Sequence, residues 1–453
     1  MNSQDSNSPP APIHQSWRKF LRRGSFAAAI RLTGLICVFA LQVLLARLIG
    51  DTGEYGKYAW GQSLLFLLGI VSAIGLPLVT ARYVASLDAR QNVVAARRVI
   101  THARGLLLRS TALAPVCALI LWLLWRGDMD GGAYRSVTIV ALLFAPAVSF
   151  TAFYRDIARA RQWLGLALLP MQVIRPLLTG ALVGLVWWQS TSAPDATRTL
   201  LLAALSVVFV LLLQAALYQR RQTTLPQTST EDSSGDYLPS KLLATAVPVF
   251  ITRCAALVIN YSNVLLVGLL AGPAAAGAYF AAERLAQLAG MPKTIVSSVN
   301  QQAMAAAHAT GNSRELQVLA TQSAHGSLWP TLLASGFLVL LATPLLELFG
   351  REFAAASPVL MILVASSVVS VFAGPAQDLL VMTGRQKYVP RVMIFSAVGH
   401  IFALLVLLPL WGATGAACAS LFSSMLGHGW LMLLARREVG VGTTVLSGLR
   451  RRQ

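Results

Sequence analysis

Apolar residues along the chain gather into long runs, and short polar segments that carry most of the charged side chains separate these runs. A helix needs about 20 predominantly apolar residues to cross the hydrocarbon core of a bilayer. The runs therefore predict an all-α polytopic membrane protein with about twelve transmembrane helices. The predicted spans are residues 25–49, 59–80, 104–125, 134–154, 163–188, 198–219, 242–270, 273–298, 327–349, 355–383, 390–411 and 413–435.

One stretch of this pattern occurs twice, because residues Leu44 to Ala103 return in diverged form as Leu265 to Ala324, roughly 221 residues later. The corresponding positions include Gly56 and Gly277, and Tyr58 and Tyr279. Since each half of the chain holds six predicted spans, the repeat predicts two pseudo-symmetric six-helix lobes with the same orientation. Transporters built from such repeats often place the substrate site between them.

The longest polar segment, Gln219 to Ser240, is rich in Ser, Thr, Gln and Pro, and we expect it to be a flexible link between the lobes. The predicted organisation is a cytoplasmic N-terminal segment at 1–24, an N-lobe at 25–219, a cytoplasmic linker at 220–241, a C-lobe at 242–435 and a basic cytoplasmic tail at 436–453.

Composition supports a membrane protein, because only 12% of the residues are charged and 56% are hydrophobic, whereas soluble domains have about 25% charged residues. The net charge of +19 does not require a nucleic-acid partner, since basic cytoplasmic loops give the same balance. Basic residues lie mostly on one side of the predicted bundle, which the positive-inside rule assigns to the cytoplasm together with both termini. They include Arg82, Arg90, Arg97, Arg155, Arg220, Arg385 and Arg436.

The sequence contains no motif typical of an enzyme, such as a Gly-rich phosphate loop followed by Lys or a spacing of zinc ligands. Its cysteines lie inside apolar runs at unrelated spacings, which fits neither a disulfide framework nor a zinc site. We therefore expect no catalytic residue, no bound metal and no cofactor. Transport would be driven by consumption of the product or by a gradient of Na⁺ or H⁺, and the sequence does not decide between them.

Charged residues inside the predicted spans are the strongest functional signal, because each is costly in lipid and normally faces a cavity or a partner. They are Arg31, Arg175, Arg253, Glu283, Arg284, Lys293 and Asp378. Five positive charges against two negative ones indicate an anionic passenger.

Helical spacing places some of these residues on common faces. Arg31 and Gln42 are eleven residues apart, about three turns, and Arg253 and Asn260 are seven apart, about two turns. Arginine suits an anionic ligand because its planar fork donates two hydrogen bonds to a phosphate and stays charged when desolvated.

The sequence also resembles a known family. The segments ARLIGDTGEYGKY, GLPLVTARYVA, GLLAGPAAAGAYFAAERLAQL and QVIRPLL are similar to those of O-antigen and exopolysaccharide flippases. These flippases belong to the multidrug/oligosaccharidyl-lipid/polysaccharide (MOP) exporter superfamily. The similarity extends over nearly the whole chain.

The resemblance implies a V-shaped pair of lobes, like that of MATE transporters, in the bacterial inner membrane. Its substrate would be a polyprenyl-diphosphate-linked oligosaccharide that crosses by alternating access for lipopolysaccharide or exopolysaccharide synthesis, and its partners membrane lipids and a polysaccharide polymerase. The first, second, seventh and eighth helices would line the cleft, so that Arg31, Arg253 and Arg284 converge there. Substrate contacts are thus expected at Arg31, Gln42, Arg175, Arg253, Asn260 and Arg284.

Several structural interpretations stay open beside these roles. Arg31 and Lys293 are close enough to span ends to extend their side chains to the interface. Glu283 is either the structural partner of an arginine or a group that couples transport to Na⁺ or H⁺. Asp378 is a second coupling candidate unless it only lies at the cytoplasmic mouth. Arg175, which precedes a proline, either contacts substrate or packs beside a helix kink.

Three other functions are found among polytopic membrane proteins of this kind. A multidrug exporter of the same superfamily would favour a cleft rich in carboxylates, whereas arginines predominate here. A peptidoglycan lipid-precursor flippase usually has two additional helices, which this sequence is not expected to form. A membrane glycosyltransferase or polymerase would need sizeable external loops, and the predicted ones are short.

Overall fold

The structure is a computed structural model that describes residues 13–124, 132–189, 193–223 and 239–444. Within these ranges the chain forms helices and short connections and contains no strand. The distal parts of the predicted N-terminal segment and tail, 1–12 and 445–453, lie outside the described residues, as does the central part of the predicted linker, 224–238.

The N-lobe contains α1 (Ile13–Ile49), α2 (Thr52–Ser72), α3 (Leu76–Ala89), α4 (Val93–Leu124), α5 (Gly132–Ala160), α6 (Leu164–Leu169), the π-helical segment η1 (Pro170–Ile174), α7 (Arg175–Gln189) and α8 (Ala196–Thr223). The C-lobe contains α9 (Pro239–Ala271), α10 (Pro273–Ala289), α11 (Met291–Ala309), α12 (Ser313–Leu340), α13 (Ala342–Glu347), the 3₁₀ segment η2 (Arg351–Ala356), α14 (Ser357–Phe372), α15 (Ala376–Met382) and α16 (Tyr388–Val439).

In the described part of the chain, seven helices are long and apolar enough to cross a membrane, and α2 with α3 forms an eighth span bent by 50°. One of the seven, α16, has two antiparallel arms, because the chain reverses at Gly412 and Nδ1 of His400 lies 3.1 Å from Oγ of Ser423. Three further spans complete the two lobes. Helix α4 is the sixth span of the N-lobe, and in the C-lobe α12 forms one span and α10 with α11 forms another, so that each lobe contains six spans in the described part of the chain. The predicted fold class is confirmed.

The helices extend beyond the predicted spans. Helix α1 begins at Ile13, within the predicted N-terminal segment, and α12 begins at Ser313, fourteen residues before its predicted span. A helix satisfies its own backbone hydrogen bonds and can continue into water, whereas hydropathy marks only the part that suits lipid. The bend between α2 and α3 lies at Gly75, whose φ of 71° favours glycine.

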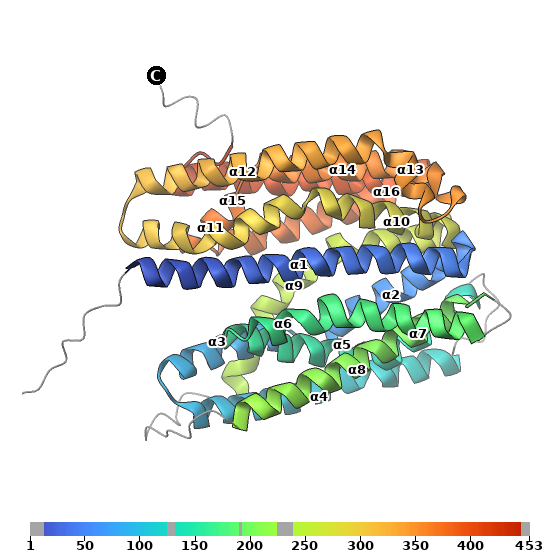
Figure 1. The fold of residues 1–453 in the computed structure, drawn as a ribbon, viewed down its shortest axis with the longest axis horizontal. Coiled ribbons are helices and arrows are strands. Elements are labelled where there is room, and N and C mark those ends of the chain that lie inside the picture. Colours follow the sequence, from blue (N-terminus) through green and yellow to red (C-terminus); the bar gives the residue numbers. More distant parts are fainter. Residues whose placement is uncertain (1–12, 125–131, 190–192, 224–238, 445–453) are drawn as a thin grey trace, which may run out of the picture.

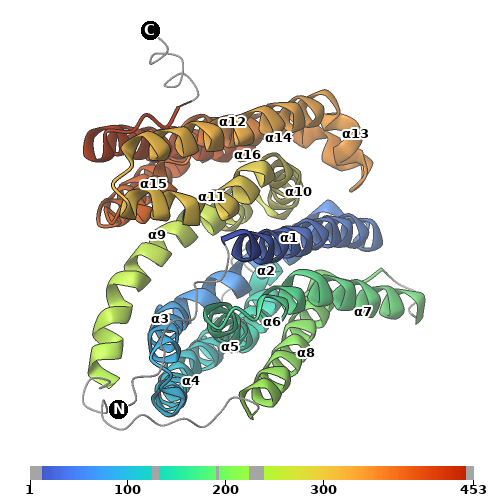
Figure 2. The ribbon, with the colours of Figure 1, turned by 60° about the vertical axis from the view of Figure 1, so that its left-hand side comes forward.

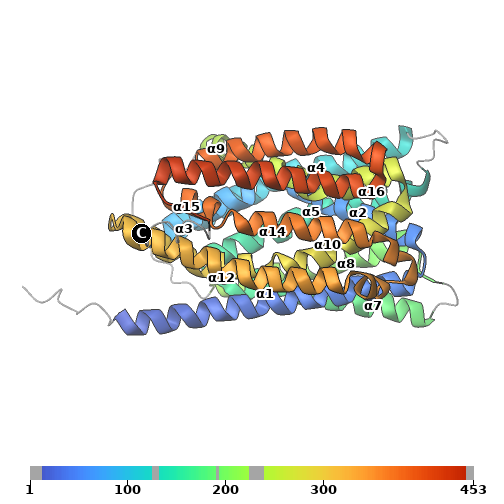
Figure 3. The ribbon, with the colours of Figure 1, turned by 90° about the horizontal axis from the view of Figure 1, so that it is seen from above.

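The two lobes lie side by side with α1 between them (Figure 1). We call the end of the bundle at which α1 begins and α16 ends the termini side, and the opposite end the far side. Helix α9 starts on the termini side beside the N-lobe and crosses to the C-lobe (Figure 2), where it packs on α16. Seen from above, α1 runs along the length of the bundle (Figure 3).

The lobes are joined on the far side, where α2 meets α10. A Cβ on Gly56 would lie 1.7 Å from the carbonyl oxygen of Pro273, and one on Gly277 would lie 2.6 Å from that of Thr52. Hydrogen bonds add to this contact, because Trp60 Nε1 donates to the Leu265 carbonyl at 3.0 Å. The two repeated glycines of the sequence thus form the crossing point of the lobes, where only glycine permits the close approach.

The hydrophobic cores show where the lobes separate. A large cluster on the far side combines residues of both lobes, such as Tyr55 and Phe280. On the termini side there are separate clusters, one around Phe153 of the N-lobe and the other around Leu379 of the C-lobe. The molecule therefore opens toward the termini side, as expected for a V-shaped transporter that is closed at its far side.

Candidate functional site

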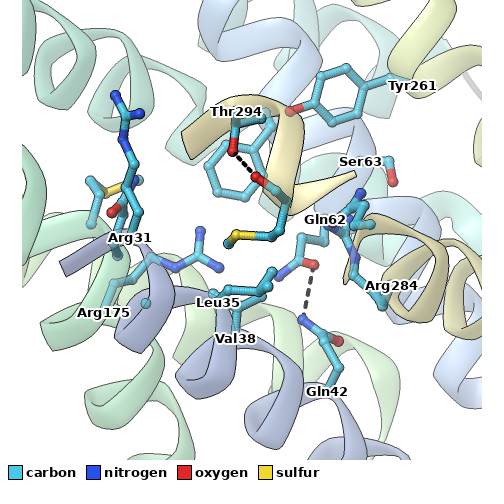
Figure 4. A pocket seen from close by; sticks show the side chains of 16 residues that line it. Arg31, Leu35, Val38, Gln42, Gln62, Ser63, Arg175, Tyr261, Arg284 and Thr294 are labelled. Carbon is cyan, nitrogen blue, oxygen red and sulfur yellow. Dashed lines mark hydrogen bonds between the residues drawn. The ribbon is translucent and has the colours of Figure 1, made fainter. Parts of the chain in front are cut away.

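A cavity of about 540 Å³ lies between the lobes, within the membrane-spanning region. We call it the cationic cavity, because side chains of three arginines line it. Its polar lining residues include Arg31, Gln42, Gln62, Arg175, Tyr261 and Arg284. Figure 4 shows Arg31 and Arg175 on one side of the cavity and Arg284 on the other.

Arg175 is the first residue of α7 and follows η1, a π-helical segment that ends at Ile174. Only 9% of its surface is exposed, and its guanidinium lies 4.9 Å from the centre of the Phe66 ring. Contact with an aromatic face compensates part of the cost of burying a cation but does not neutralise its charge. Among the described residues, no carboxylate lies within ion-pairing distance of Arg175.

Arg284 has similar surroundings on the opposite wall. Its guanidinium lies 4.2 Å from the centre of the Phe280 ring, and its Nη1 donates to Oε1 of Gln287 at 3.0 Å. Its Nε is buried without a hydrogen-bond partner. No carboxylate of the described residues pairs with it, although Glu283 precedes it in the chain.

Arg161 shows how a buried arginine is neutralised elsewhere in the same chain. Its side chain is 3% exposed, and its Nε lies 2.9 Å from Oδ2 of Asp88. Its guanidinium also lies against the rings of Trp163 and Tyr218. The contrast indicates that the arginines of the cationic cavity are available to an external anion, since burying an unpaired charge is costly.

The base of the cationic cavity is a hydrogen-bonded network of α1 and α2. Tyr55 OH donates to Oε1 of Gln42 at 3.2 Å, and Nε2 of Gln62 donates to Tyr58 OH at 2.7 Å. All four side chains are buried. This network closes the cavity toward the far side, so access is from the termini side.

Not all predicted substrate residues meet in the cationic cavity. Arg31, Gln42, Arg175 and Arg284 do, but Arg253 is exposed and lines neither this cavity nor the next. Arg253 lies on α9, and the first part of this helix leans toward the N-lobe. Ala246 and Val249 of α9 belong to the hydrophobic cluster of the N-lobe. The structure thus places Arg253 outside both of these cavities, and its expected contact with substrate stays a prediction.

Arg253 instead belongs to a group of arginines on the termini side of the cavity. Arg31, Arg155 and Arg253 all lie close enough to Arg159 to interact with it electrostatically. We call these four residues the mouth arginines. Arg155 and Arg159 follow the fourth span in the sequence, so they count only as loop charges in a hydropathy pattern.

A second cavity, also of about 540 Å³, lies within the C-lobe, between α9, α10, α11, α14, α15 and α16. We call it the serine-rich chamber. Its serines are Ser366, Ser367, Ser370, Ser396, Ser420, Ser423 and Ser424. Asn260 and Glu283 line this chamber, and Gln287 and Thr294 line both cavities, so the two spaces adjoin.

Two other charged residues predicted inside the spans of the C-lobe, Lys293 and Asp378, have polar partners. Lys293 Nζ donates to Ser370 Oγ at 2.6 Å and to its carbonyl at 2.8 Å, so its side chain does not extend to the interface. Asp378 accepts hydrogen bonds from Ser297 Oγ at 2.6 Å and from Gln301 Nε2 at 3.0 Å. It borders a narrow polar space next to the serine-rich chamber, and Lys293 contacts both.

Sequence reasoning identified Gln42 and Asn260, which line the cationic cavity and the serine-rich chamber, but it missed the other neutral residues of both cavities. Gln62, Tyr261 and Gln287 line the cationic cavity, but only their position on the correct helix face distinguishes them from packing residues. The described residues contain no group of three or more His, Cys, Asp or Glu side chains that could hold a metal ion.

The profile of a family described as polysaccharide biosynthesis protein matches residues 21–305. No curated protein matches the chain. An inward-facing multidrug resistance MATE family transporter of the MOP superfamily shares 16% identity with a TM-score of 0.72, covering 91% of this chain and 98% of its own.

Two further solved structures share this architecture. An outward-facing MATE family transporter has 14% identity and a TM-score of 0.59, covering 93% of this chain and 97% of its own. A MOP superfamily transporter from Pyrococcus furiosus has 14% identity and a TM-score of 0.63, covering 93% and 96%. These likenesses confirm the predicted two-lobed, MATE-like fold.

Proposed function

The chain belongs to the polysaccharide biosynthesis protein family, and from this membership we propose that it is a flippase for polyprenyl-diphosphate-linked oligosaccharide. It would act in the bacterial inner membrane, by alternating access, to supply surface polysaccharide synthesis. The substrate would cross the membrane without chemical change, in keeping with a fold shared with transporters.

The cationic cavity carries this proposal. Three arginines from both lobes line one space, and no carboxylate among the described residues pairs with Arg175 or Arg284. Each such charge costs several kcal/mol inside a membrane, so it requires a compensating partner. A diphosphate has the charge and the oxygen atoms to accept forked hydrogen bonds from more than one guanidinium.

The direction of opening agrees with this substrate. By the positive-inside rule, the termini side, which carries most of the basic residues, would face the cytoplasm. The cavity would then admit substrate from the cytoplasm past the mouth arginines. Export would be driven by a polymerase that consumes the product, or by Na⁺ or H⁺ acting at Glu283 or Asp378.

A multidrug exporter is the alternative suggested by the fold of the relatives. Its lipophilic cations would be repelled by the unpaired arginines, whose charge is weakly screened in a low-dielectric cavity. The relative from Pyrococcus furiosus is described as having a binding pocket of reversed polarity, which suggests a different function. A peptidoglycan-precursor flippase would share the diphosphate and differ in the glycan.

The test is complementation of the source strain after deletion of this gene, with surface polysaccharide as the readout and membrane protein measured by blot. Arg175→Ala and Arg284→Ala should reduce transport roughly tenfold to a hundredfold, because a hydrogen bond to a charged group is worth about 1.5 to 3 kcal/mol. The corresponding Lys variants should be impaired less, since they keep the charge and lose the fork.

Arg198→Ala is the matched control, because this arginine is exposed on the far side. Normal polysaccharide from well-expressed Arg175→Ala and Arg284→Ala proteins would refute the phosphate contact. Loss of these two proteins from the membrane, with the control present, would assign the arginines to the fold instead.

A further inference from the structure

The serine-rich chamber has a composition that helix packing explains only in part. Ser424 Oγ donates to the Ser366 carbonyl at 3.1 Å and thereby joins α16 to α14. Such hydroxyls are common contacts between membrane helices. The chamber nevertheless remains an open volume of about 540 Å³, within the range of roughly 300 to 1,000 Å³ that is typical of small-molecule sites.

Two buried polar atoms of the chamber lining have no hydrogen-bond partner among the described residues. Asn263 is 5% exposed, and its Nδ2 donates to Ser420 Oγ at 2.9 Å while its Oδ1 has no hydrogen bond. Ser396 is 2% exposed, and its Oγ also lacks a partner. Buried polar atoms are normally satisfied, so these two indicate that a polar ligand completes the chamber.

Glu283 adds a charged acceptor to the same wall. It lines the chamber and shares a hydrogen bond with Gln287, and although Arg284 attracts it electrostatically, no cation of the described residues lies within ion-pairing distance of its carboxylate. Lys293, which also lines the chamber, is held by Ser370, whose Oγ lies 3.0 Å from Nε2 of His428. The chamber therefore offers both hydrogen-bond donors and hydrogen-bond acceptors.

The position of the chamber relates it to the cationic cavity. Glu283 and Arg284 are consecutive on α10, and each lines a different space. Gln287, near the end of α10, and Thr294, near the start of α11, border both spaces. A ligand bound to Arg284 could extend past these two side chains into the chamber.

We propose that the serine-rich chamber binds the sugars next to the diphosphate of the lipid-linked substrate, with Glu283, Asn263 and Ser396 contacting their hydroxyl groups. This inference rests on the proposed function and deepens it, because it assigns the two parts of one substrate to two adjoining spaces. The diphosphate lies at the arginines, and the glycan lies in the C-lobe.

The chemistry of the lining favours sugar over other ligands. A sugar hydroxyl both donates and accepts hydrogen bonds, which matches a mixture of serine, amide and carboxylate groups. A second phosphate would meet Glu283, which disfavours an anion, and a lipophilic cation would meet the ammonium of Lys293. Each correct hydroxyl contact supports specificity, because a missing one leaves buried polar groups unpaired.

The experiment compares two probes on the full-length protein in lipid nanodiscs. The first is undecaprenyl diphosphate, and the second is the lipid-linked oligosaccharide purified from the source strain that lacks this gene. The dissociation constant of each probe is measured for the wild type and for Ser396→Ala, Glu283→Gln and Ser367→Phe. Ser298→Phe is the steric control, since this exposed serine of α11 lines none of the described cavities.

We expect the wild type to bind the glycosylated probe more tightly than undecaprenyl diphosphate. Ser396→Ala should weaken only the glycosylated probe, by about twofold to tenfold, and Glu283→Gln by about tenfold. Ser367→Phe, which fills the chamber, should remove the difference between the probes. Ser298→Phe should change neither affinity.

The result that overturns the inference is equal affinity for the two probes in the wild type, or equal weakening of both probes in the chamber variants. In either case the proposed function would stand if undecaprenyl diphosphate still requires Arg175 and Arg284. Failure of the wild type to bind either probe would overturn the proposed function together with the inference. Because Ser396→Ala removes only one unpartnered hydroxyl, the comparison does not depend on the bulky variant folding.

Discussion

The cationic cavity and the serine-rich chamber have similar volumes but opposite kinds of polarity. The first offers guanidinium groups and aromatic faces, and the second offers many hydroxyls and amides together with the carboxylate of Glu283 and the ammonium of Lys293. A single helix, α10, separates them, since Arg284 faces one and Glu283 the other. This difference suggests how the protein can recognise the diphosphate of one substrate in the first space and its sugars in the second.

The two spaces also differ in what they are made of. The cationic cavity takes residues from both lobes, such as Arg175 of α7 and Arg284 of α10, whereas every residue of the serine-rich chamber comes from the C-lobe. Alternating access moves one lobe against the other. We therefore expect the contacts between the arginines and the diphosphate to change during transport, while the sugar site moves as a unit with the C-lobe.

Reversing the charge of the cationic cavity should have the largest effect. In the double variant Arg175→Glu and Arg284→Glu, two carboxylates replace the cations that would face the diphosphate, so transport should fall at least about a hundredfold. Surface polysaccharide in the complemented deletion strain measures this loss. The matched control is Arg198→Glu, and transport by a well-expressed double variant would remove the distinction between the two spaces.

Ionic strength should also distinguish the two spaces, with a smaller change in affinity than the charge reversal causes. Raising NaCl from about 0.05 M to about 0.5 M should weaken undecaprenyl diphosphate binding severalfold, because salt screens charge attraction at the open mouth. The ratio of its dissociation constant to that of the glycosylated probe should stay constant, since hydroxyl contacts carry no net charge. A ratio that falls with salt would show that the sugar, too, is bound by charge.

The smallest effect is expected at Arg253. Because it is exposed and lines neither space, Arg253→Ala should change the affinity for either probe by less than about twofold. Arg284→Ala, measured in the same assay, is the comparison. A loss of tenfold or more in Arg253→Ala would place the diphosphate at the mouth arginines instead of in the cavity.

The sequence was sufficient to predict the architecture, because bilayer thickness imposes the length of each apolar run and the repeat imposes two similar lobes. It even identified Gly56 and Gly277 as equivalent positions, and these prove to be the close contact between the lobes. Helix ends were less predictable, as α1 and α12 show, since hydropathy does not report where a helix stops in water.

The candidate site could be predicted only in part. Charges such as Arg175 and Arg284 stand out in an apolar run, and both line the same cavity. The position of Arg253 depends on how α9 tilts toward the N-lobe, and a hydropathy pattern does not predict the tilt of a helix. The serine-rich chamber was also invisible, since serine in a membrane helix is common and only the three-dimensional packing shows which hydroxyls surround an open space.

The most direct test of the account is a cryo-electron microscopy map of the protein in nanodiscs with the lipid-linked oligosaccharide bound. The account predicts density for the diphosphate within hydrogen-bonding distance of Arg175 and Arg284, and density for the adjoining sugars beside Glu283, Asn263 and Ser396. Diphosphate density at Arg253, or sugar density that leaves the serine-rich chamber unoccupied, would contradict it.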